Sequence, residues 1–167
     1  MITTAHYQTP IGVIAVTLLN EQINGLELDR CKPDTSHINS KVTYDPRYRG
    51  LQKKLGEQLK RYFAAPQTGF DLPLQQQGTP YQQRVWRALQ RIPSGKTLTY
   101  GQLAKRLHSS PRAIGNACRQ NPLPLLVPCH RVVAASGLGG FAGETAGRPL
   151  ALKRWLLEHE GVTLKPE

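Results

Sequence analysis

The stretch from Asn121 to Val133 restricts the fold more than any other part of this sequence. It reads Asn-Pro-Leu-Pro-Leu-Leu-Val-Pro-Cys-His-Arg-Val-Val, with prolines at positions 122, 124 and 128. Each proline fixes its own φ and has no N–H to donate, so the segment can be neither a helix nor an ordinary strand. Its apolar residues predict a rigid, buried segment that holds the thiol of Cys129 in one place.

Cys129 is followed by two basic residues, His130 and Arg131. Neighbouring cations lower the pKa of a thiol and favour the nucleophilic thiolate. A free cysteine is also among the most frequently buried residues, so an inert structural thiol explains this stretch equally well. The rest of the chain has to decide between these two interpretations.

The net charge of +11 is unevenly distributed along the 167 residues. Residues 1–75 carry nine Lys and Arg against seven Asp and Glu, whereas residues 76–167 carry thirteen against four. No acidic residue occurs from Leu72 to Gly143, where nine basic residues do. An ordinary solvated surface mixes both signs, so this bias predicts a surface that meets a polyanion, most commonly nucleic acid.

The composition also argues against several classes of protein. No apolar run approaches the ~20 residues of a membrane span, and no secretory signal is recognisable, so we expect a cytoplasmic protein without a membrane partner. Cys31, Cys118 and Cys129 form no Cys-x-x-Cys pair, and the histidines show no zinc spacing. We therefore expect reduced thiols and no metal.

The first 75 residues predict a small α/β lobe. Residues 2–9 and 11–19 are typical of strands, and Asn24-Gly25 predicts a hairpin turn before a third strand. Apolar residues at helical spacing predict a helix from about Tyr48 to Ala65. Residues 66–78, rich in Pro, Gly and Gln, predict a linker, which divides the chain into domains at 1–75 and 76–167.

The second domain opens with Thr79-Pro80, a helix cap followed by proline at the first helical position. The helix should bury Val85, Trp86, Leu89 and Ile92. Two short helices follow, one after Thr99 and one after Ser110, in a helix-turn-helix pattern. Helix pairs of this kind also occur in proteins that never touch DNA. The small residues of the second helix suit either close approach to DNA or tight packing on a neighbouring helix.

Two features complete this domain. The glycine-rich segment 136–143 is suited to a connector or to a pocket wall, because glycine permits unusual φ values and close approach to a ligand. A last helix should start near Pro149 and end at Gly161. We expect its Leu152, Trp155, Leu156 and Leu157 to share one apolar side.

Taken together, residues 78–161 resemble the O6-alkylguanine-DNA alkyltransferases (methylated-DNA–protein-cysteine methyltransferases). The matching motifs are Gly78-Thr79-Pro80, Val85-Trp86, Ile92-Pro93, Thr99-Tyr100-Gly101, Arg112-Ala113-Ile114-Gly115, Asn121-Pro122, Pro128-Cys129-His130-Arg131-Val132 and His159-Glu160-Gly161. Residues 1–75 fit the variable N-terminal lobe of that family in outline. The implied fold is α+β: a ribonuclease-H-like α/β lobe, then a mostly helical lobe with a winged helix-turn-helix.

The resemblance implies a DNA repair protein that needs no cofactor. It would flip O6-alkylguanine, and O4-alkylthymine, out of double-stranded DNA and transfer the alkyl group irreversibly to its own Cys129, once per molecule. It would act as a monomer, with cooperative binding along DNA left open. Cys129 would be the nucleophile, His130 its base through a bound water, Glu160 the holder of His130, Asn121 a brace, and Tyr100 the partner of the flipped guanine.

The resemblance also implies contacts to substrate and DNA. Arg112 would enter the duplex and fill the space left by the flipped base, and the carbonyls of Cys129 and Val132 with the N–H of Ala142 would contact the guanine edge. The full set of substrate and DNA contacts would be Arg112, Ala113, Gly115, Cys118, Arg119, Val132, Phe141, Ala142 and Lys153.

The required chemistry agrees with these residue types. An alkyl carbon on guanine O6 is a weak electrophile, so its transfer needs a strong nucleophile and neutralisation of the leaving purine, which a thiolate and a Tyr hydroxyl can supply. The base must also leave the stack, at a cost of a few kcal/mol. Three departures from the family concern the pocket: Phe141 stands where many members have Tyr, Cys118 adds a second thiol, and residues 143–152 form a longer segment than in some relatives.

Three alternatives remain to be weighed. A lesion-binding alkyltransferase-like protein would lack the acceptor thiol, so Cys129 argues against it. A helix-turn-helix regulator would share the basic face but gives no reason for Pro-Cys-His-Arg. A cysteine hydrolase usually draws its Cys and His from distant parts of the chain, whereas Cys129 and His130 are adjacent.

Overall fold

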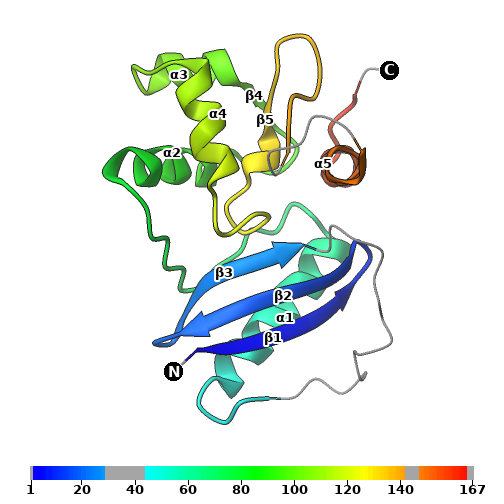
Figure 1. Ribbon diagram of the computed structural model, residues 1–167. Helices are drawn as coiled ribbons and strands as arrows, with labels where there is room; N and C mark the ends of the chain where they lie inside the picture. Colours follow the sequence, from blue (N-terminus) through cyan, green and yellow to red (C-terminus); the bar gives the residue numbers. More distant parts are fainter. Residues whose placement is uncertain (1, 29–43, 142–146, 165–167) are drawn as a thin grey trace. The chain divides into compact units, whose positions relative to one another are not determined.

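The computed structural model describes residues 2–28, 44–141 and 147–164, in a chain that divides into two compact units, Met1–Gln77 and Gly78–Glu167 (Figure 1). Within the described residues, the first unit contains a sheet and one α-helix, and the second contains four α-helices, one short 3-10 helix and two short strands. The predicted α+β class is therefore confirmed. No helix in the described ranges is long and apolar enough to cross a membrane.

The first unit is an antiparallel three-stranded sheet with one helix on it (Figure 1). Its strands are β1 (Thr3–Thr9), β2 (Gly12–Leu19) and β3 (Gln22–Leu28), in that spatial order. Alternate strand residues such as Tyr7, Ile14 and Val16 are buried, as the two-residue period of a strand requires. Helix α1 (Arg49–Ala64) buries its own apolar stripe, and the Tyr7 hydroxyl donates to the Gln52 carbonyl at 2.9 Å.

The predicted turn at Asn24-Gly25 is wrong. The hairpin turns instead at Asn20 and Glu21, whose φ values of 50° and 60° match the left-handed pair of a type I′ turn. Asn24 lies inside β3, between two residues that pair with consecutive residues of β2, so it is the extra residue of a β-bulge. Asn-Gly suits either position, and only the pairing register decides between them.

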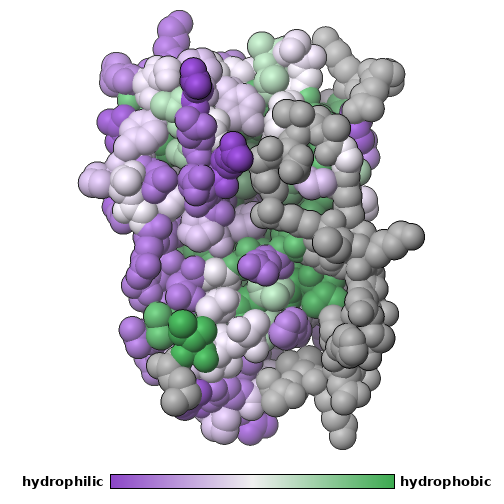
Figure 2. All heavy atoms as spheres, in the orientation of Figure 1, coloured by the Kyte–Doolittle hydropathy of each residue, from purple (hydrophilic) through white to green (hydrophobic). Residues whose placement is uncertain are grey.

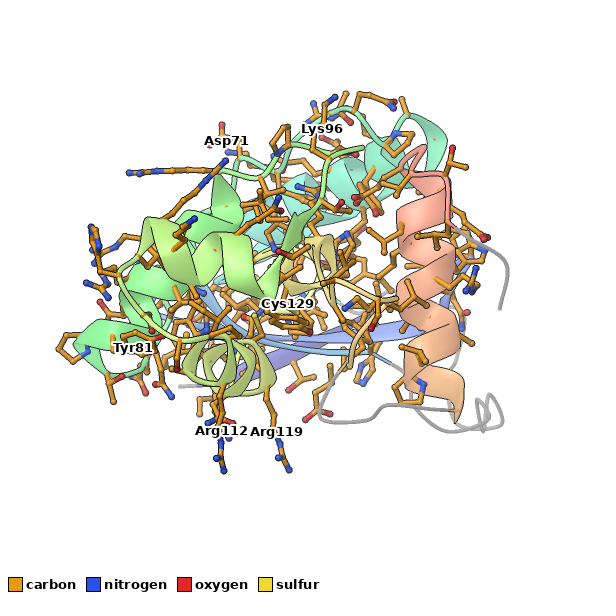
Figure 3. All side chains as sticks on the ribbon, turned by 90° about the horizontal axis from the view of Figure 1, so that it is seen from above. Asp71, Tyr81, Lys96, Arg112, Arg119 and Cys129 are labelled. Atoms are coloured by element: carbon orange, nitrogen blue, oxygen red, sulfur yellow. The ribbon has the colours of Figure 1, made fainter. Side chains whose placement is uncertain are left out.

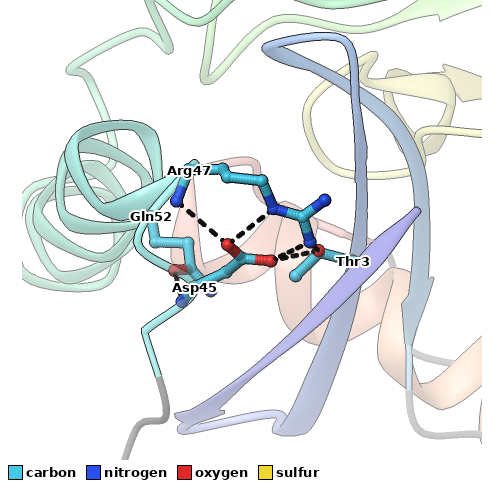
Figure 4. A network of polar contacts seen from close by, with 4 residues as sticks. All are labelled: Thr3, Asp45, Arg47 and Gln52. Carbon is cyan, nitrogen blue, oxygen red and sulfur yellow. Dashed lines mark hydrogen bonds and ion pairs between the residues drawn. The ribbon is translucent and has the colours of Figure 1, made fainter. Parts of the chain in front are cut away.

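A polar network fixes the segment before α1 to the first strand (Figure 4). The Asp45 carboxylate accepts from the Thr3 hydroxyl at 2.6 Å and from Arg47 Nε at 3.0 Å. The Asp45 N–H donates to the Gln52 side chain at 2.9 Å. The hydrogen bond from the Arg47 guanidinium, followed by that from Thr3, holds the pKa of Asp45 well below its usual range.

Part of the predicted linker belongs to the first unit. The Ile23 N–H donates to the Pro73 carbonyl, and the Gln75 N–H donates back to the Ile23 carbonyl, both at 2.8 Å. The side chain of Gln58 on α1 makes two hydrogen bonds to the backbone of Asp71, at 2.8 and 2.9 Å. The segment therefore follows the outer edge of β3 before the second unit begins at Gly78.

The first three helices of the second unit start where the sequence predicts them. Thr79 caps α2 (Pro80–Gln90), Thr99 caps α3 (Tyr100–Arg106) and Ser110 caps α4 (Pro111–Arg119), each by accepting from a backbone N–H three residues on. The remaining elements are β4 (Leu98–Thr99), parallel to β5 (Val132–Val133), the short 3-10 helix η2 (Cys129–Arg131) and α5 (Gly147–His159). The predicted core residues Val85, Trp86, Leu89 and Ile92 are all buried.

Helix α5 differs from its prediction in which side is buried. Trp155 is 36% exposed and stacks on His159 at 4.8 Å between ring centroids. The buried stripe consists of Lys153, Leu156, Leu157 and Glu160, at positions i, i+3, i+4 and i+7. Because Lys153 and Glu160 are charged, the spacing of apolar residues alone does not predict this buried side.

Candidate active site

The segment before Cys129 is a fixed, non-repetitive support. Residues 121–128 form neither a helix nor a strand, as the prolines predict. The Asn121 side chain spans the turn: its Nδ2 donates to the Val127 carbonyl at 2.8 Å, and its Oδ1 accepts from the Leu123 N–H at 3.0 Å. Leu123, Leu125, Leu126 and Val127 are buried. The thiol of Cys129 is therefore held by packing and by one Asn side chain.

His130 and Glu160 form a fully buried pair. His130 Nε2 lies 2.9 Å from Glu160 Oε2, and neither side chain has any exposed surface. Burial lowers the pKa of His130, so the ring is neutral near pH 7. A carboxylate can only accept, so Nε2 carries the ring hydrogen and Nδ1 keeps its lone pair. Nδ1 is buried and makes no hydrogen bond within the described residues.

Arg131 was missed as a site residue, although it lies in the Pro-Cys-His-Arg motif. Its Nε and one terminal nitrogen donate to both oxygens of Glu160, at 2.8 and 3.0 Å, and its other terminal nitrogen donates to the Ile92 carbonyl at 2.6 Å. Burial alone would raise the pKa of Glu160, but hydrogen bonds from His130 and Arg131 outweigh it and hold the pKa at about 2. The sequence did contain one indication of this role. Residues 76–167 hold only four acidic residues, so Arg131 has few possible carboxylate partners.

The expected lowering of the Cys129 pKa is wrong for the free protein. Burial raises the pKa of this thiol, and the opposing effects of the Asn121 side chain and the Lys153 charge are smaller. The two neighbours in sequence do not supply a cation, because His130 is neutral and Arg131 is paired with Glu160. A thiol in this site therefore needs a base to become a nucleophile.

Lys153 lies inside the unit and not on its surface. Its Nζ donates to the carbonyls of Val132 and Gly140, at 2.6 and 2.9 Å. Burial lowers its pKa to about 8. The ammonium group also lies 5.7 Å from the ring centroid of Tyr100. As placed here, Lys153 joins β5 to the glycine-rich segment beside the thiol.

Tyr100 starts α3 and faces the same segment. Its hydroxyl lies 3.5 Å from the Gly140 carbonyl, and burial raises its pKa to about 12, so it stays protonated. Gly139 has a φ of 76°, and a Cβ there would lie 2.8 Å from the Tyr100 ring. Glycine is thus required at 139 both for its conformation and for space. The segment serves as a wall against Tyr100, one of the two roles considered for it.

The structure describes some of the pocket residues that the resemblance implies, but not all of them. The Cys129 carbonyl accepts from the Val132 N–H and the Val132 carbonyl accepts from Lys153, which leaves each oxygen a second lone pair for a ligand. Phe141 is buried. Ala142, and the predicted longer segment up to residue 146, lie outside the described residues.

Helix α4 presents its arginines away from the core. Arg112 and Arg119 project from the same side of the helix (Figure 3), while Ile114 and Ala117 are buried on the other. Figure 2 shows hydrophilic residues gathered over α3 and α4 on the face in view. A Cβ at Gly115 would meet nothing within 4 Å, so packing on a neighbour does not explain the glycine there. Ala113 is partly exposed, and Cys118 is a half-buried free thiol.

No cluster of three or more metal-ligating side chains occurs in the ranges that the structure describes. The site therefore offers a buried thiol, a neutral imidazole oriented by a carboxylate and an arginine, and a protonated phenol. Together with the exposed arginines of α4, these groups can supply a nucleophile, a base, a hydrogen-bond donor and a cationic docking face.

Comparison with known proteins gives consistent matches. Residues 80–162 match the family described as 6-O-methylguanine DNA methyltransferase, DNA binding domain. The chain is 36% identical over 166 residues to the methylated-DNA–protein-cysteine methyltransferase of Metallosphaera sedula, covering 99% of this chain and 97% of the relative. It is 37% identical to the constitutive enzyme of that name from Bacillus subtilis, covering 98% and 96%. The structure of Mycobacterium tuberculosis OGT in complex with DNA is similar with a TM-score of 0.70 at 34% identity, covering 94% of this chain and 92% of that one.

Proposed function

The chain belongs to the family of the 6-O-methylguanine DNA methyltransferases, and from this we propose that Cys129 accepts the alkyl group of an O6-alkylguanine in DNA. The protein is a DNA repair enzyme of the methylated-DNA–protein-cysteine methyltransferase type. The observation that carries the assignment of Cys129 is its place at the end of a rigid segment, directly before the buried His130–Glu160–Arg131 cluster. A helix-turn-helix regulator would have no use for that cluster.

His130 is the base in this proposal. Glu160 holds Nε2, which directs the free lone pair of Nδ1 into the buried site, where a water molecule relays the proton of the Cys129 thiol. Because burial raises the thiol pKa and lowers that of His130, the ion pair is unfavourable in the free protein. The thiolate then forms in appreciable amount only when substrate is present to consume it.

The transfer is a direct displacement. The Cys129 sulfur forms a bond to the alkyl carbon, the bond from that carbon to O6 breaks, and its electron pair stays on the purine. Tyr100, protonated because its pKa is raised to about 12, donates a hydrogen bond to the leaving base and assists its protonation. The thioether is chemically stable, so each molecule acts once and no cofactor takes part.

DNA docks on α4 in this scheme. Arg112 enters the duplex and fills the space of the flipped base, and Arg119 on the same side pairs with phosphate. The space around Gly115 supports close approach of this helix to a groove, the first of the two explanations for its small residues. Extruding the base costs a few kcal/mol, which these contacts offset.

The finer features implied by the resemblance are part of the same proposal. The helices α3 and α4 act as a winged helix-turn-helix, the first unit has a ribonuclease-H-like fold, and the protein works as a monomer in the cytoplasm. O4-alkylthymine is a second substrate. The three-stranded sheet with a helix and the capped helix pair support the fold assignments.

Intact-protein mass spectrometry tests the acceptor role. Wild type, Cys129→Ser and the control Cys118→Ser are incubated with an oligonucleotide that contains O6-methylguanine. We expect a gain of one methyl group in wild type and in Cys118→Ser, mapped to Cys129, and none in Cys129→Ser. Wild type that binds the lesion without gaining a methyl group would be a recognition protein only. The absence of both transfer and lesion preference would favour a regulator.

A further inference from the structure

Helix α2 carries a row of arginines that the alkyl-transfer site does not use. Arg84 and Arg87 lie on α2, and Arg91 is the residue that caps its C-terminus. Their spacing of i, i+3 and i+7 places them on one side of the helix, and all three are exposed. The opposite side of α2 is buried through Val85, Trp86 and Leu89. We call these three residues the α2 arginine face.

This face points away from the DNA-facing side of α4. The two helices pack through their buried sides, and the Trp86 indole donates to the Ala117 carbonyl at 2.9 Å. Arg112 and Arg119 lie on the opposite side of α4 from Ala117. The helix pair therefore carries arginines on both outer sides.

The α2 arginine face is anchored to the end of α3, which adds further positive charge. Arg84 donates to the Leu107 carbonyl at 2.9 Å, and the two residues before Leu107 are the exposed Lys105 and Arg106. Neither α2, α3 nor α4 contains an acidic residue. Helices exposed only to water gain from mixed charges, so a uniformly positive outer side matches a polyanion better than solvent.

A single straight duplex cannot reach both faces. Each helix with its side chains is about 10–12 Å across, so a packed pair is about 20 Å thick. Duplex DNA has a persistence length of about 150 base pairs, and curling it around one helix pair would cost many times the few kcal/mol of a protein-induced bend. A duplex on α4 therefore leaves the α2 arginine face free for another segment.

We propose that the α2 arginine face binds the phosphate backbone of a second segment of duplex DNA while α4 holds the first. The inference rests on the proposed function in one respect, namely that α4 is the helix that docks on DNA. Contacts from arginine to phosphate are independent of sequence, so the second segment needs no lesion. A protein that touches two segments can pass between them while it searches for damage.

The test uses two undamaged duplexes of about two helical turns, one labelled with a donor dye and the other with an acceptor. Energy transfer at low salt reports bridging, and sedimentation of the complex must show one protein with two duplexes. The variant is R87Q/R91Q, which leaves the anchored Arg84 in place. The control K53Q/K60Q removes the same charge from exposed positions on α1.

We expect R87Q/R91Q to weaken binding of the second duplex by about tenfold or more and to reduce its salt slope by about 2, while K53Q/K60Q bridges like wild type. Wild type that binds only one duplex, or equal losses in both variants, would overturn the proposal. Methyl transfer from a single short lesion duplex should be unchanged in R87Q/R91Q. Because bridging uses undamaged DNA, a protein that failed to accept a methyl group would refute the proposed function without affecting this readout.

Discussion

The buried carboxylate of Glu160 allows a quantitative prediction for Glu160→Gln. Its pKa is about 2 in the folded protein against an ordinary value of 4.5. One pKa unit corresponds to about 1.4 kcal/mol, so the charged carboxylate stabilises the fold by about 3 kcal/mol at neutral pH. Glutamine resembles the protonated carboxyl and loses this contribution. Removing one partner of a buried ion pair costs a similar 3–5 kcal/mol or so.

The pH dependence of this loss follows from the direction of the pKa shift. The folded pKa of Glu160 is depressed, so its contribution is present above pH 4.5 and is lost as the pH falls towards 2. The difference in unfolding free energy between wild type and Glu160→Gln should therefore be about 3 kcal/mol at pH 7. Relative to pH 7, this difference in unfolding free energy should be smaller by about 1 kcal/mol at pH 4 and by about 2 kcal/mol at pH 3.

Urea unfolding followed by tryptophan fluorescence measures this difference in the relevant unit, because Trp86 and Trp155 both lie there. The matched control is Glu158→Gln in the last turn of α5, two residues before Glu160. Glu158 lies 3.6 Å from Arg154 and is 55% exposed, so its loss should cost less than about 1 kcal/mol at any pH. The reasoning would be refuted if Glu160→Gln lowered the unfolding free energy as little as the control does, or if the loss did not change with pH.

Three further predictions concern the pocket and the DNA face. Arg112→Ala should slow repair in duplex DNA by about tenfold or more but leave reaction with free O6-benzylguanine nearly unchanged, because only the duplex requires base flipping; equal losses would exclude that role. Gly139→Ala should destabilise the protein by about 1–3 kcal/mol in urea unfolding, because its φ of 76° and the nearby Tyr100 ring exclude a Cβ. The control Gly137→Ala, where a Cβ meets nothing within 4 Å, should be almost neutral. Lys153→Met should slow the reaction of Cys129 with iodoacetamide at pH 7, because Lys153, with a pKa of about 8, is still charged there and favours the thiolate; a rate unchanged relative to Lys96→Met would contradict this.

Local chemistry explains the parts of the fold that were predicted correctly. Thr79, Thr99 and Ser110 mark helix starts because their side chains accept from N–H groups three residues away. The prolines before Cys129 exclude regular structure whatever surrounds them. Such signals need no knowledge of distant residues.

Non-local contacts explain the misses. The turn at Asn20 and Glu21 depends on strand register, and the exposure of Trp155 depends on α5 burying Lys153 and Glu160. The role of Arg131 required knowledge that Glu160, 29 residues away, lies within 2.8 Å. Charged residues in a core give no periodic signal, because their burial is compensated by partners elsewhere in the chain.

The sequence alone determined four features of this protein. These are the thiol on its proline-braced segment, the capped helix pair, the positive charge of residues 76–167, and the family resemblance that the other three support. Only the tertiary structure decided the state of the site: a neutral thiol, a neutral His130, and a Glu160 that holds its charge against burial. The pKa of each group is a sum of burial and of contacts with residues distant in the chain, and neither quantity exists before the chain has folded.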